Sequence, residues 1–556
     1  AQLVTARAAG FASWPKLKAF IDEQQTAKAR HLNAPFAART FNSPRHLQVG
    51  WIEPDGGNDP TGNGEHTQGG TTSNGKVVDV PPSRVWFVEY DAGTDDGWDS
   101  FVDEVRQRQI PGINLRGNLK DDQVKDLADL HHLIMVCFSH NRSLTDDGIH
   151  HLSSLSNLEY LALVGCASIT SKGLWILSHM PRLRVVRFYE STQISDQAIA
   201  ELKDHQHLEV ITLDQTICGD ESLRLLADKT SITHISIGSK TTDKGLNHLS
   251  AFPGLTYMDE HRPQHKLDVY RGPNRSWIRL DSLHISNEGL AVLAKLHGVE
   301  NVSISGHLKH EGLTDAIFAP MSQMENLIGF EMTGQVLTDQ AMVAISRMQK
   351  LKEISLWDAR ATDLGMAELA RSSSISRINA ANFHNLSGKG VAALAGMPYL
   401  KKLSIGSKNC PDAALSALKD FPALESFTTG NQNIFTDEAF RYIAAIPGLK
   451  HLTNMYVRDE KGYHTTDRST DYLAQARLLK SYAVWGSRIT DKSCETLSKM
   501  SSLREILFYA CPAITDDGIR LLGRLPALRK LDLQGMEQLT KDVALAFDRS
   551  VTVNLC

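Results

Sequence analysis

The sequence has no stretch of 18 consecutive apolar residues, no surplus of either charge and few cysteines. The first absence predicts that no helix spans a membrane. The chain carries 59 lysines and arginines against 64 aspartates and glutamates, a net charge of -5, so no cationic surplus is available for nucleic-acid phosphates or anionic lipids. Its 7 cysteines are scattered and do not form a disulfide framework. We therefore predict no nucleic-acid partner, no membrane partner and reduced thiols.

Sequence signatures of catalysis are also missing. The chain lacks HExxH, CxxC and GxSxG motifs, and the SIGSK segments at 236–240 and 404–408 lack the spacing of a phosphate-binding loop. Neighbouring histidines at positions 131, 132, 140, 150 and 151 fall in predicted helix and loop segments, which disfavours a metal site. The sequence therefore predicts no enzyme, no cofactor and no metal ion.

A repeat of 24 or 25 residues runs from about residue 110 onward, most clearly at 158–183, which reads LEYLALVGCASITSKGLWILSHMPRL. Each unit opens with alternating apolar and polar residues, the period of a half-buried strand, and closes with apolar residues three and four apart, the stripe of a helix. One unit cannot bury its apolar face alone, so we expect a stack. The first inward strand positions are 113, 136, 161, 186, 211, 235, 258, 302, 330, 354, 378, 403, 427, 452, 482, 506 and 531.

Threonine–aspartate pairs recur where strand gives way to helix. Adjacent carboxylates such as Asp146 and Asp147 could suggest acid–base catalysis, but their recurrence with the repeat favours helix capping. In that interpretation the threonine hydroxyl caps the helix and the aspartate favours its positive end. The pairs lie at 145/146, 242/243, 338/339, 362/363, 436/437, 490/491 and 515/516.

The pattern resembles the leucine-rich repeat proteins, specifically the cysteine-containing subclass whose unit reads LxxLxLxxCxxITDxGLxxL, over about residues 110–550. The motif cysteine is kept as Cys166 and Cys511, and other units carry Asn141, Ser191, Thr216 and Ser487 there. The resemblance implies an α/β leucine-rich repeat solenoid, a curved horseshoe of about 17 repeats with a parallel concave sheet and convex helices.

The remaining segments are assigned by composition. Residues 1–52 are predicted as an N-terminal helical segment, whose start is similar to a short bacterial segment reading AQLVxARxxGFxSWPxLK and favours a bacterial source. Residues 53–77 are rich in glycine, asparagine and threonine and predict a flexible linker. Residues 78–110 predict a strand and helix that cap the solenoid. Residues 111–556 form the repeat domain, with insertions at 259–277 and 456–469.

Residues that alternate with the inward ones should face the concave surface, and aromatic and arginine side chains there are typical interface anchors. Insertions in repeat arrays often lie on the binding face, although tolerated surface loops are the plain alternative. Exposed aromatic residues without a role are the alternative for the strands. The candidate partner-binding residues are Tyr160, Arg187, Tyr189, Trp357, Trp485 and Tyr509 on the strands and Tyr270, Arg271, Tyr456 and Tyr463 in the insertions.

These observations favour a non-catalytic scaffold that binds a protein partner through the concave face and the two inserted loops. Two alternatives stay open: a regulatory or targeting part of a larger enzyme with its catalytic domain upstream of residue 1, and a secreted effector or surface adhesin. The chain begins with Ala1 and not with methionine, so an upstream segment is conceivable. Without one, the expected location is the cytoplasm. The oligomeric state is open.

Overall fold

The alternating residues of each repeat form short parallel strands in the computed structural model, and the apolar stripes that follow form short helices. The chain divides into unit 1, residues 1–241 and 251–275, and unit 2, residues 242–250 and 276–556. Each unit is described by itself. The structure describes residues 38–52, 70–72, 76–93, 97–253, 255, 257–259, 277–280, 286–296, 299–305, 313–333, 337–381, 383, 385–406, 410–430, 435–454 and 465–555.

Unit 1 alternates strands with short α-helices and 3₁₀-helices (η). Its described elements are β1 (Arg39–Phe41), β2 (Gln48–Ile52), β3 (Gly70–Thr71), β4 (Val78–Val80), β5 (Val85–Asp91), α3 (Trp98–Arg108), β6 (Gly112–Arg116), α4 (Asp121–Val124), η2 (Lys125–Leu127), β7 (Met135–Ser139), α5 (Asp146–Ile149), η3 (His150–Ser154), β8 (Tyr160–Val164), η4 (Gly173–His179), β9 (Val185–Tyr189), α6 (Asp196–Ala200), β10 (Val210–Thr212), α7 (Asp220–Leu226), β11 (His234–Ser236) and β12 (Tyr257–Asp259).

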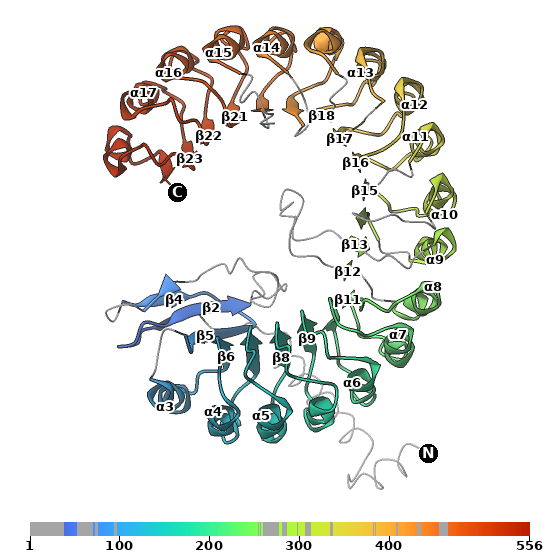
Figure 1. Ribbon diagram of the computed structural model, residues 1–556, viewed down its shortest axis with the longest axis vertical. Coiled ribbons are helices and arrows are strands. Elements are labelled where there is room, and N and C mark those ends of the chain that lie inside the picture. The colour runs from blue at the N-terminus through green and yellow to red at the C-terminus, as the bar shows by residue number, and fades with distance from the viewer. Residues whose placement is uncertain are drawn as a thin grey trace, which may run out of the picture. The chain divides into compact units, whose positions relative to one another are not determined.

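Unit 2 continues the alternation, and its strands line the inner side of an arc whose outer side carries the helices (Figure 1). One 3₁₀-helix, η5 (Asn247–Ala251), ends at the boundary between the units. The other described elements are α8 (Asp243–Leu246), β13 (Trp277–Leu280), α9 (Asn287–Leu290), η7 (Ala291–Lys295), β14 (Asn301–Ser305), η8 (Asp315–Ile317), α10 (Phe318–Met321), β15 (Gly329–Thr333), α11 (Asp339–Ser346), β16 (Glu353–Trp357), α12 (Asp363–Leu369), β17 (Arg377–Ala381), α13 (Gly388–Leu394), β18 (Lys402–Gly406), η9 (Asp412–Asp420), β19 (Ser426–Thr429), α14 (Asp437–Ile443), β20 (His451–Asn454), α15 (Asp467–Leu473), β21 (Ser481–Trp485), α16 (Asp491–Leu497), β22 (Glu505–Tyr509), α17 (Asp516–Leu522), β23 (Lys530–Gln534), η10 (Lys541–Ala546) and β24 (Thr552–Leu555).

The register of the parallel sheet follows the inward residues that the sequence pattern indicates. In unit 1 the consecutive partners are Ile113, Val136, Leu161, Val186, Ile211, Ile235 and Met258. In unit 2 they are Val302, Phe330, Ile354, Ile378, Leu403, Phe427, Leu452, Tyr482, Ile506, Leu531 and Val553. Because each inward side chain stacks on the next, the repeats share a core that no single repeat has. The predicted α/β leucine-rich repeat solenoid is confirmed.

One strand was missed by the sequence pattern. Trp277 begins β13, which pairs in parallel with β14 and places Ile278 opposite Val302. The predicted insertion at 259–277 is therefore wrong at both ends, since residue 259 belongs to β12 and residue 277 to β13. The strand was overlooked because Ile278 follows Met258 by 20 residues instead of the usual 24, which breaks the period.

The N-terminal assignments need a second correction. Residues 39–41 and 48–52 are strands, so the helical segment predicted for residues 1–52 does not extend to its end, and residues 1–37 lie outside the described part. β2 pairs antiparallel with β5 and with β3, which lies inside the predicted linker 53–77. Strand propensity in QVGWI, with its β-branched and aromatic residues, outweighs the helical pattern further upstream. The strand β5 and helix α3 lie where residues 78–110 predict them.

The threonine–aspartate pairs do cap helices, and they also join neighbouring repeats. Thr145, Thr242, Thr338, Thr362, Thr436 and Thr490 each accept a bond from the amide two residues on. Thr515 makes no such cap bond. The aspartate of each pair accepts bonds from the next repeat, as when Thr515 donates its amide and its hydroxyl to Asp491 at 2.8 and 2.7 Å. The aspartates therefore act between repeats, a role beyond the predicted effect on the helix dipole.

Candidate partner-binding face

The inner face of each unit is formed by the strand residues that alternate with the inward, core-facing ones, and on β7 to β9 of unit 1 most of this face is buried. Met135 and Cys137 of β7, Tyr160 and Ala162 of β8 and Val185 of β9 form one apolar cluster with Ile52, Val85 and Phe87. Tyr160 is 5% exposed and Cys137 is 0% exposed. Ile52 belongs to β2, so part of the cover comes from the N-terminal strands.

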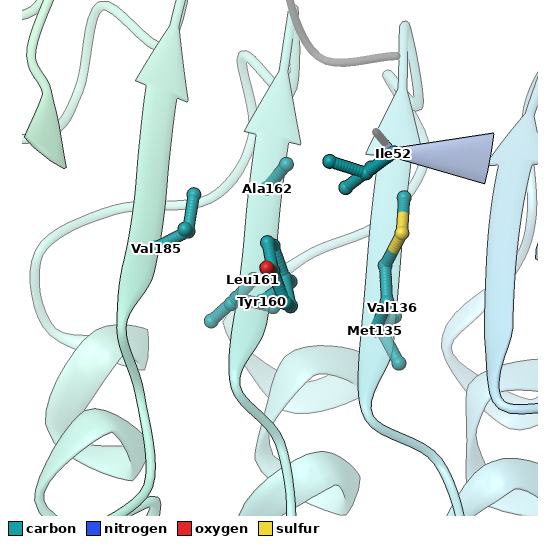
Figure 2. A pocket seen from close by; sticks show the side chains of 7 residues that line it. All are labelled: Ile52, Met135, Val136, Tyr160, Leu161, Ala162 and Val185. Carbon is teal, nitrogen blue, oxygen red and sulfur yellow. The ribbon is translucent and has the colours of Figure 1, made fainter. Parts of the chain in front are cut away.

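A small apolar hollow remains in this cluster. Ile52 points toward side chains of β7, β8 and β9, including Met135, Ala162 and Val185 (Figure 2). The volume of the hollow is only about 10 Å³, far below the roughly 300–1,000 Å³ typical of sites for cofactors and drug-sized ligands. The hollow therefore provides no room for a bound small molecule.

Charged side chains at the edge of this face neutralise one another. Arg184 is 4% exposed, and its Nε lies 3.1 Å from Oε1 of Glu209. Arg84 reaches the same carboxylate at 2.9 Å and lies over the ring of Tyr160, 5.8 Å from its centroid. Glu159 lies 3.7 Å from Arg184. Unit 1 thus closes its inner face with packing and with compensated charge.

Two of the predicted anchors are therefore core residues. Tyr160 and Tyr189 are 5% and 7% exposed, and the amide of Gln215 donates to the Tyr189 hydroxyl at 3.4 Å. Their prediction as accessible partner-binding residues is wrong, and for Tyr160 the reason is that β2 and β5 contribute apolar cover that a bare concave sheet would lack. Arg187 is half-buried on the same face.

Unit 2 presents an exposed aromatic pair on its inner face. Trp485 and Tyr509 lie opposite each other on β21 and β22, with ring centroids 5.3 Å apart and planes tilted by 33°. They are 37% and 42% exposed. Leu507 is half-buried on the same face of β22. The structure brings together these two predicted anchors and leaves them accessible.

Trp357 lies on the inner face of β16 and is half-buried. Its indole Nε1 donates to the hydroxyl of Ser355 at 3.0 Å, and the amide of Asn379 donates to the same hydroxyl at 3.1 Å. These bonds hold the indole to its own sheet. Trp357 therefore has a fixed orientation, with less accessible surface than a free anchor.

A row of basic side chains lies where the strands of unit 2 begin. We define the basic edge as the two residues that precede the inward residue in each strand from β18 to β23. All are exposed or half-buried. They are Lys401, Lys402, Glu425, Ser426, Lys450, His451, Lys480, Ser481, Arg504, Glu505, Arg529 and Lys530.

Few of these cations are paired within the protein. Lys450 lies 2.9 Å from Glu425, and Lys530 lies 2.8 Å from Asp532. In the part of the chain that the structure describes, no ion pair includes Lys401, Lys402, Lys480, Arg504 or Arg529. The basic edge thus carries charge that the fold does not neutralise.

Two groups on this edge titrate as expected for crowded cations. Burial, followed by the charge of Arg377, lowers the pKa of Lys402 from its usual value. Burial also lowers the pKa of His451, with the positive charges of Lys402 and Lys480 adding to the shift and Glu505 and Glu425 opposing it. The basic edge is not among the sequence predictions, which concern inward positions and aromatic residues. Its signal in the sequence is the recurrence of lysine and arginine just before each inward residue.

The four predicted loop residues Tyr270, Arg271, Tyr456 and Tyr463 lie outside the described residues. The same holds for nearly all of the insertions, so whether both project from one edge stays a prediction. The described part of the second insertion is Thr465–Ser469, where Thr466 caps α15 and donates to Asp437. This insertion therefore ends in the regular cap of the next repeat.

The described cysteines are buried free thiols. Burial raises the pKa of Cys166, Cys410 and Cys511 to about 12 and that of Cys218 to about 11. Thiols with such pKa values are rarely ionised at neutral pH, so they offer no activated nucleophile. Among the described residues, no group of three or more potential ligands could hold a metal ion. Nor does any helix in the described ranges have the length and apolarity to cross a bilayer.

Comparison with known proteins gives similarity of fold alone. No protein-family model matches the chain, and no curated protein matches it. Among solved structures, an internalin, InlF, from Listeria monocytogenes is 18% identical, with a TM-score of 0.41 over 70% of this chain and 94% of that one. A chain of the Rad7 and Elc1 complex in yeast is 15% identical, with a TM-score of 0.34 over 64% and 86%. A chain of the TLR13–ssRNA13 complex is 13% identical, with a TM-score of 0.46 over 84% of this chain and 73% of that one. At these values no partner or activity is transferred.

Proposed function

We propose that this protein is a non-catalytic scaffold that captures a protein partner on the inner face of unit 2. The exposed Trp485–Tyr509 pair carries the proposal. Tryptophan and tyrosine are enriched among residues whose truncation weakens protein interfaces, because they bury large rigid surfaces at low entropic cost. The buried thiols and the small apolar hollow of unit 1 favour binding over catalysis.

The proposal moves the partner from the whole concave face to unit 2. The candidate anchors of the sequence pattern include Tyr160, Arg187 and Tyr189 on β8 and β9 and Trp485 and Tyr509 on β21 and β22. Tyr160 and Tyr189 are buried in unit 1, whereas Trp485 and Tyr509 of unit 2 are exposed. The bacterial source and the cytoplasmic location stay predictions of the sequence.

Site-specific photo-crosslinking tests this function. A photoreactive phenylalanine analogue at position 485 should crosslink a protein in cells of the source organism. The matched control is position 175, because Trp175 is also 37% exposed but lies on the helix η4. We expect a partner adduct from position 485 and none of that mass from position 175.

Substitution gives the second readout. Trp485→Ala should weaken capture of that partner by at least about 30-fold, the equivalent of roughly 2 kcal/mol, with Trp175→Ala unchanged. Equal adducts from both positions, or capture that survives Trp485→Ala combined with Tyr509→Ala, would show that the aromatic pair is not the binding site.

A further inference from the structure

The basic edge of unit 2 opposes the charge of the chain as a whole. The protein has a net charge of -5, yet the twelve residues of this edge contain seven lysines and arginines against two glutamates. Seven minus two leaves five positive charges, with His451 counted as neutral. The composition has no surplus of basic residues, so the positive charge is concentrated on this edge.

The strip is continuous across neighbouring strands. The strands β18 to β23 pair one after another in parallel, so their first residues lie side by side. Six strands span five gaps of about 4.8 Å each, or roughly 24 Å. An extended polypeptide rising about 3.4 Å per residue would cover that distance with about seven residues.

The cations also repel one another in the free protein. After burial, Arg377 lowers the pKa of Lys402 while Glu353 and Glu425 oppose it, and Lys402 and Lys480 lower the pKa of His451 while Glu505 and Glu425 oppose it. A row of like charges costs free energy that a ligand of opposite charge recovers on binding. The edge is therefore arranged for an anionic ligand and against a cationic one.

We propose that the basic edge binds an extended, acidic polypeptide segment of the partner, while a separate apolar side chain of that partner is seated on Trp485 and Tyr509. The inference rests on the proposed function and adds the chemistry of the partner. The two features come from the same repeats, since Lys480 and Arg504 directly precede β21 and β22 and Trp485 and Tyr509 end these strands, four residues or roughly 13 Å beyond their first residues.

Two features favour a polypeptide over a nucleic acid. Glu425 and Glu505 interrupt the edge, and a uniform phosphate backbone would be repelled by both. A polypeptide places its carboxylates at chosen positions and avoids them. Beside the edge, the middle positions of β18, β19 and β20 are the half-buried Ser404, Thr428 and Thr453, whose hydroxyls suit the amides of a peptide backbone.

A synthetic peptide tests the proposal on the intact chain. The probe is a fluorescein-labelled nonapeptide in which four glutamates alternate with four serines around a central leucine, and its binding is followed by fluorescence anisotropy. The same peptide with glutamines in place of glutamates is the charge control, and a labelled single-stranded oligouridine of equal length is the nucleic-acid arm. We expect the acidic peptide to bind, the glutamine peptide not to bind, and affinity to fall from about 50 to about 200 mM NaCl.

Charge reversal locates the site. The variant Lys401→Glu, Lys402→Glu and Lys480→Glu should weaken peptide binding by at least about tenfold. The matched control is Lys492→Glu with Lys499→Glu, which changes exposed lysines on or just after α16. The milder variant Lys480→Gln with Arg504→Gln should give a smaller loss of affinity. A loss in this variant shows that the effect of charge reversal does not arise from misfolding alone.

The outcomes separate this inference from the proposed function. Oligouridine binding without peptide binding, or peptide binding that charge reversal leaves unchanged, overturns the acidic segment. If position 485 still crosslinks a partner in that case, the scaffold function stands and only its partner chemistry is wrong. If the peptide binds through the basic edge while position 485 captures nothing, the acidic specificity holds and the aromatic anchor fails.

Discussion

The strands β7 to β9 of unit 1 and β18 to β23 of unit 2 share one repeat but use their inner faces in opposite ways. In unit 1 the first strand positions are apolar or paired: Met135, Tyr160 and Val185 are at most 5% exposed, and Arg184 lies between Glu159 and Glu209. In unit 2 the two positions before each inward residue of β18 to β23 are exposed or half-buried, and seven of these twelve residues are lysine or arginine. The strand register is equivalent in both, so the fold does not determine this difference.

The contrast shows which residues of a repeat are free to change. Inward positions are fixed by packing, because each must stack on its neighbours, whereas inner-face positions only have to suit what covers them. Unit 1 covers its face partly with its own strand β2. Unit 2 leaves the aromatic pair and the basic edge available, which is why the binding proposal belongs there.

The largest expected effect compares an aromatic residue from each inner face. Tyr160→Ala should destabilise the protein by about 3–5 kcal/mol, because it empties a buried position in the apolar cluster of unit 1. Trp485→Ala should cost less than about 1 kcal/mol, since the side chain is already 37% exposed. Chemical denaturation of both variants measures the two values. Equal losses would mean that the faces do not differ in burial and would break the comparison.

The next effect compares charge. Arg184→Met should cost about 2–3 kcal/mol, because it leaves Glu209 and Glu159 without their buried partner while Arg84 compensates only in part. Lys402→Met removes a cation from a repelling row and should change stability by less than about 0.5 kcal/mol. Thermal unfolding at low and high salt checks both. A larger loss from Lys402→Met than from Arg184→Met would contradict the view that unit 2 leaves its charges uncompensated.

Replacing the aspartates that join neighbouring repeats should reduce stability by a similar, smaller amount in both units. Such a result would confine the difference between the units to the inner face. Asp146→Asn and Asp467→Asn each weaken the bonds to the threonine of the next repeat, Thr170 and Thr490, and each should cost about 1–2 kcal/mol. The exposed Asp517→Asn serves as control. Markedly unequal losses would show that the repeat joints differ as well.

Acid titration adds a second readout for Asp467. Burial raises the pKa of this carboxyl, but the hydrogen bonds from Ser493 and Thr490 outweigh it and the pKa is lowered overall. The folded protein therefore gains stability above the ordinary carboxyl pKa of about 3.9 and loses it as the pH falls through the lower folded value. Asp467→Asn should flatten unfolding curves below about pH 4. An unchanged acid slope would refute that role.

The repeat positions were predictable because they obey a period. Residues such as Val136, Leu403 and Leu531 were identified from spacing alone, and the sheet register follows them. Ile278 was missed because its spacing departs from that period. Packing between distant strands leaves no such signature, so the cover of Tyr160 by a segment more than a hundred residues upstream could not be inferred from β8 itself.

The candidate site was predictable in part. Trp485 and Tyr509 were found because they occupy the same position in consecutive repeats. The residues of the basic edge also occupy equivalent positions in consecutive repeats. Because the chain has nearly balanced charge, their clustering becomes visible only when the six strands are aligned. The sequence pattern does not distinguish the buried from the exposed inner face, because the strands of both have the same alternation of apolar and polar residues.

The smallest expected effect concerns His451, which faces Lys402, Lys480, Glu425 and Glu505 on the basic edge. Its pKa is lowered by burial and by the two lysines, so the unfolded chain takes up a proton first as the pH falls. The free protein should therefore lose a little stability as the pH falls through the ordinary histidine value of about 6.5.

A bound acidic peptide reverses that balance, because it favours the protonated imidazole. Peptide affinity should then rise by less than about threefold between pH 7.5 and 5.5, an effect limited by solvent screening at this exposed position. Anisotropy titrations at the two pH values, on the parent chain and on His451→Asn, measure the change. The variant should lose the pH dependence while keeping its affinity at pH 7.5. Affinity that falls on acidification would place the peptide away from His451, and with it away from the basic edge that distinguishes unit 2 from unit 1.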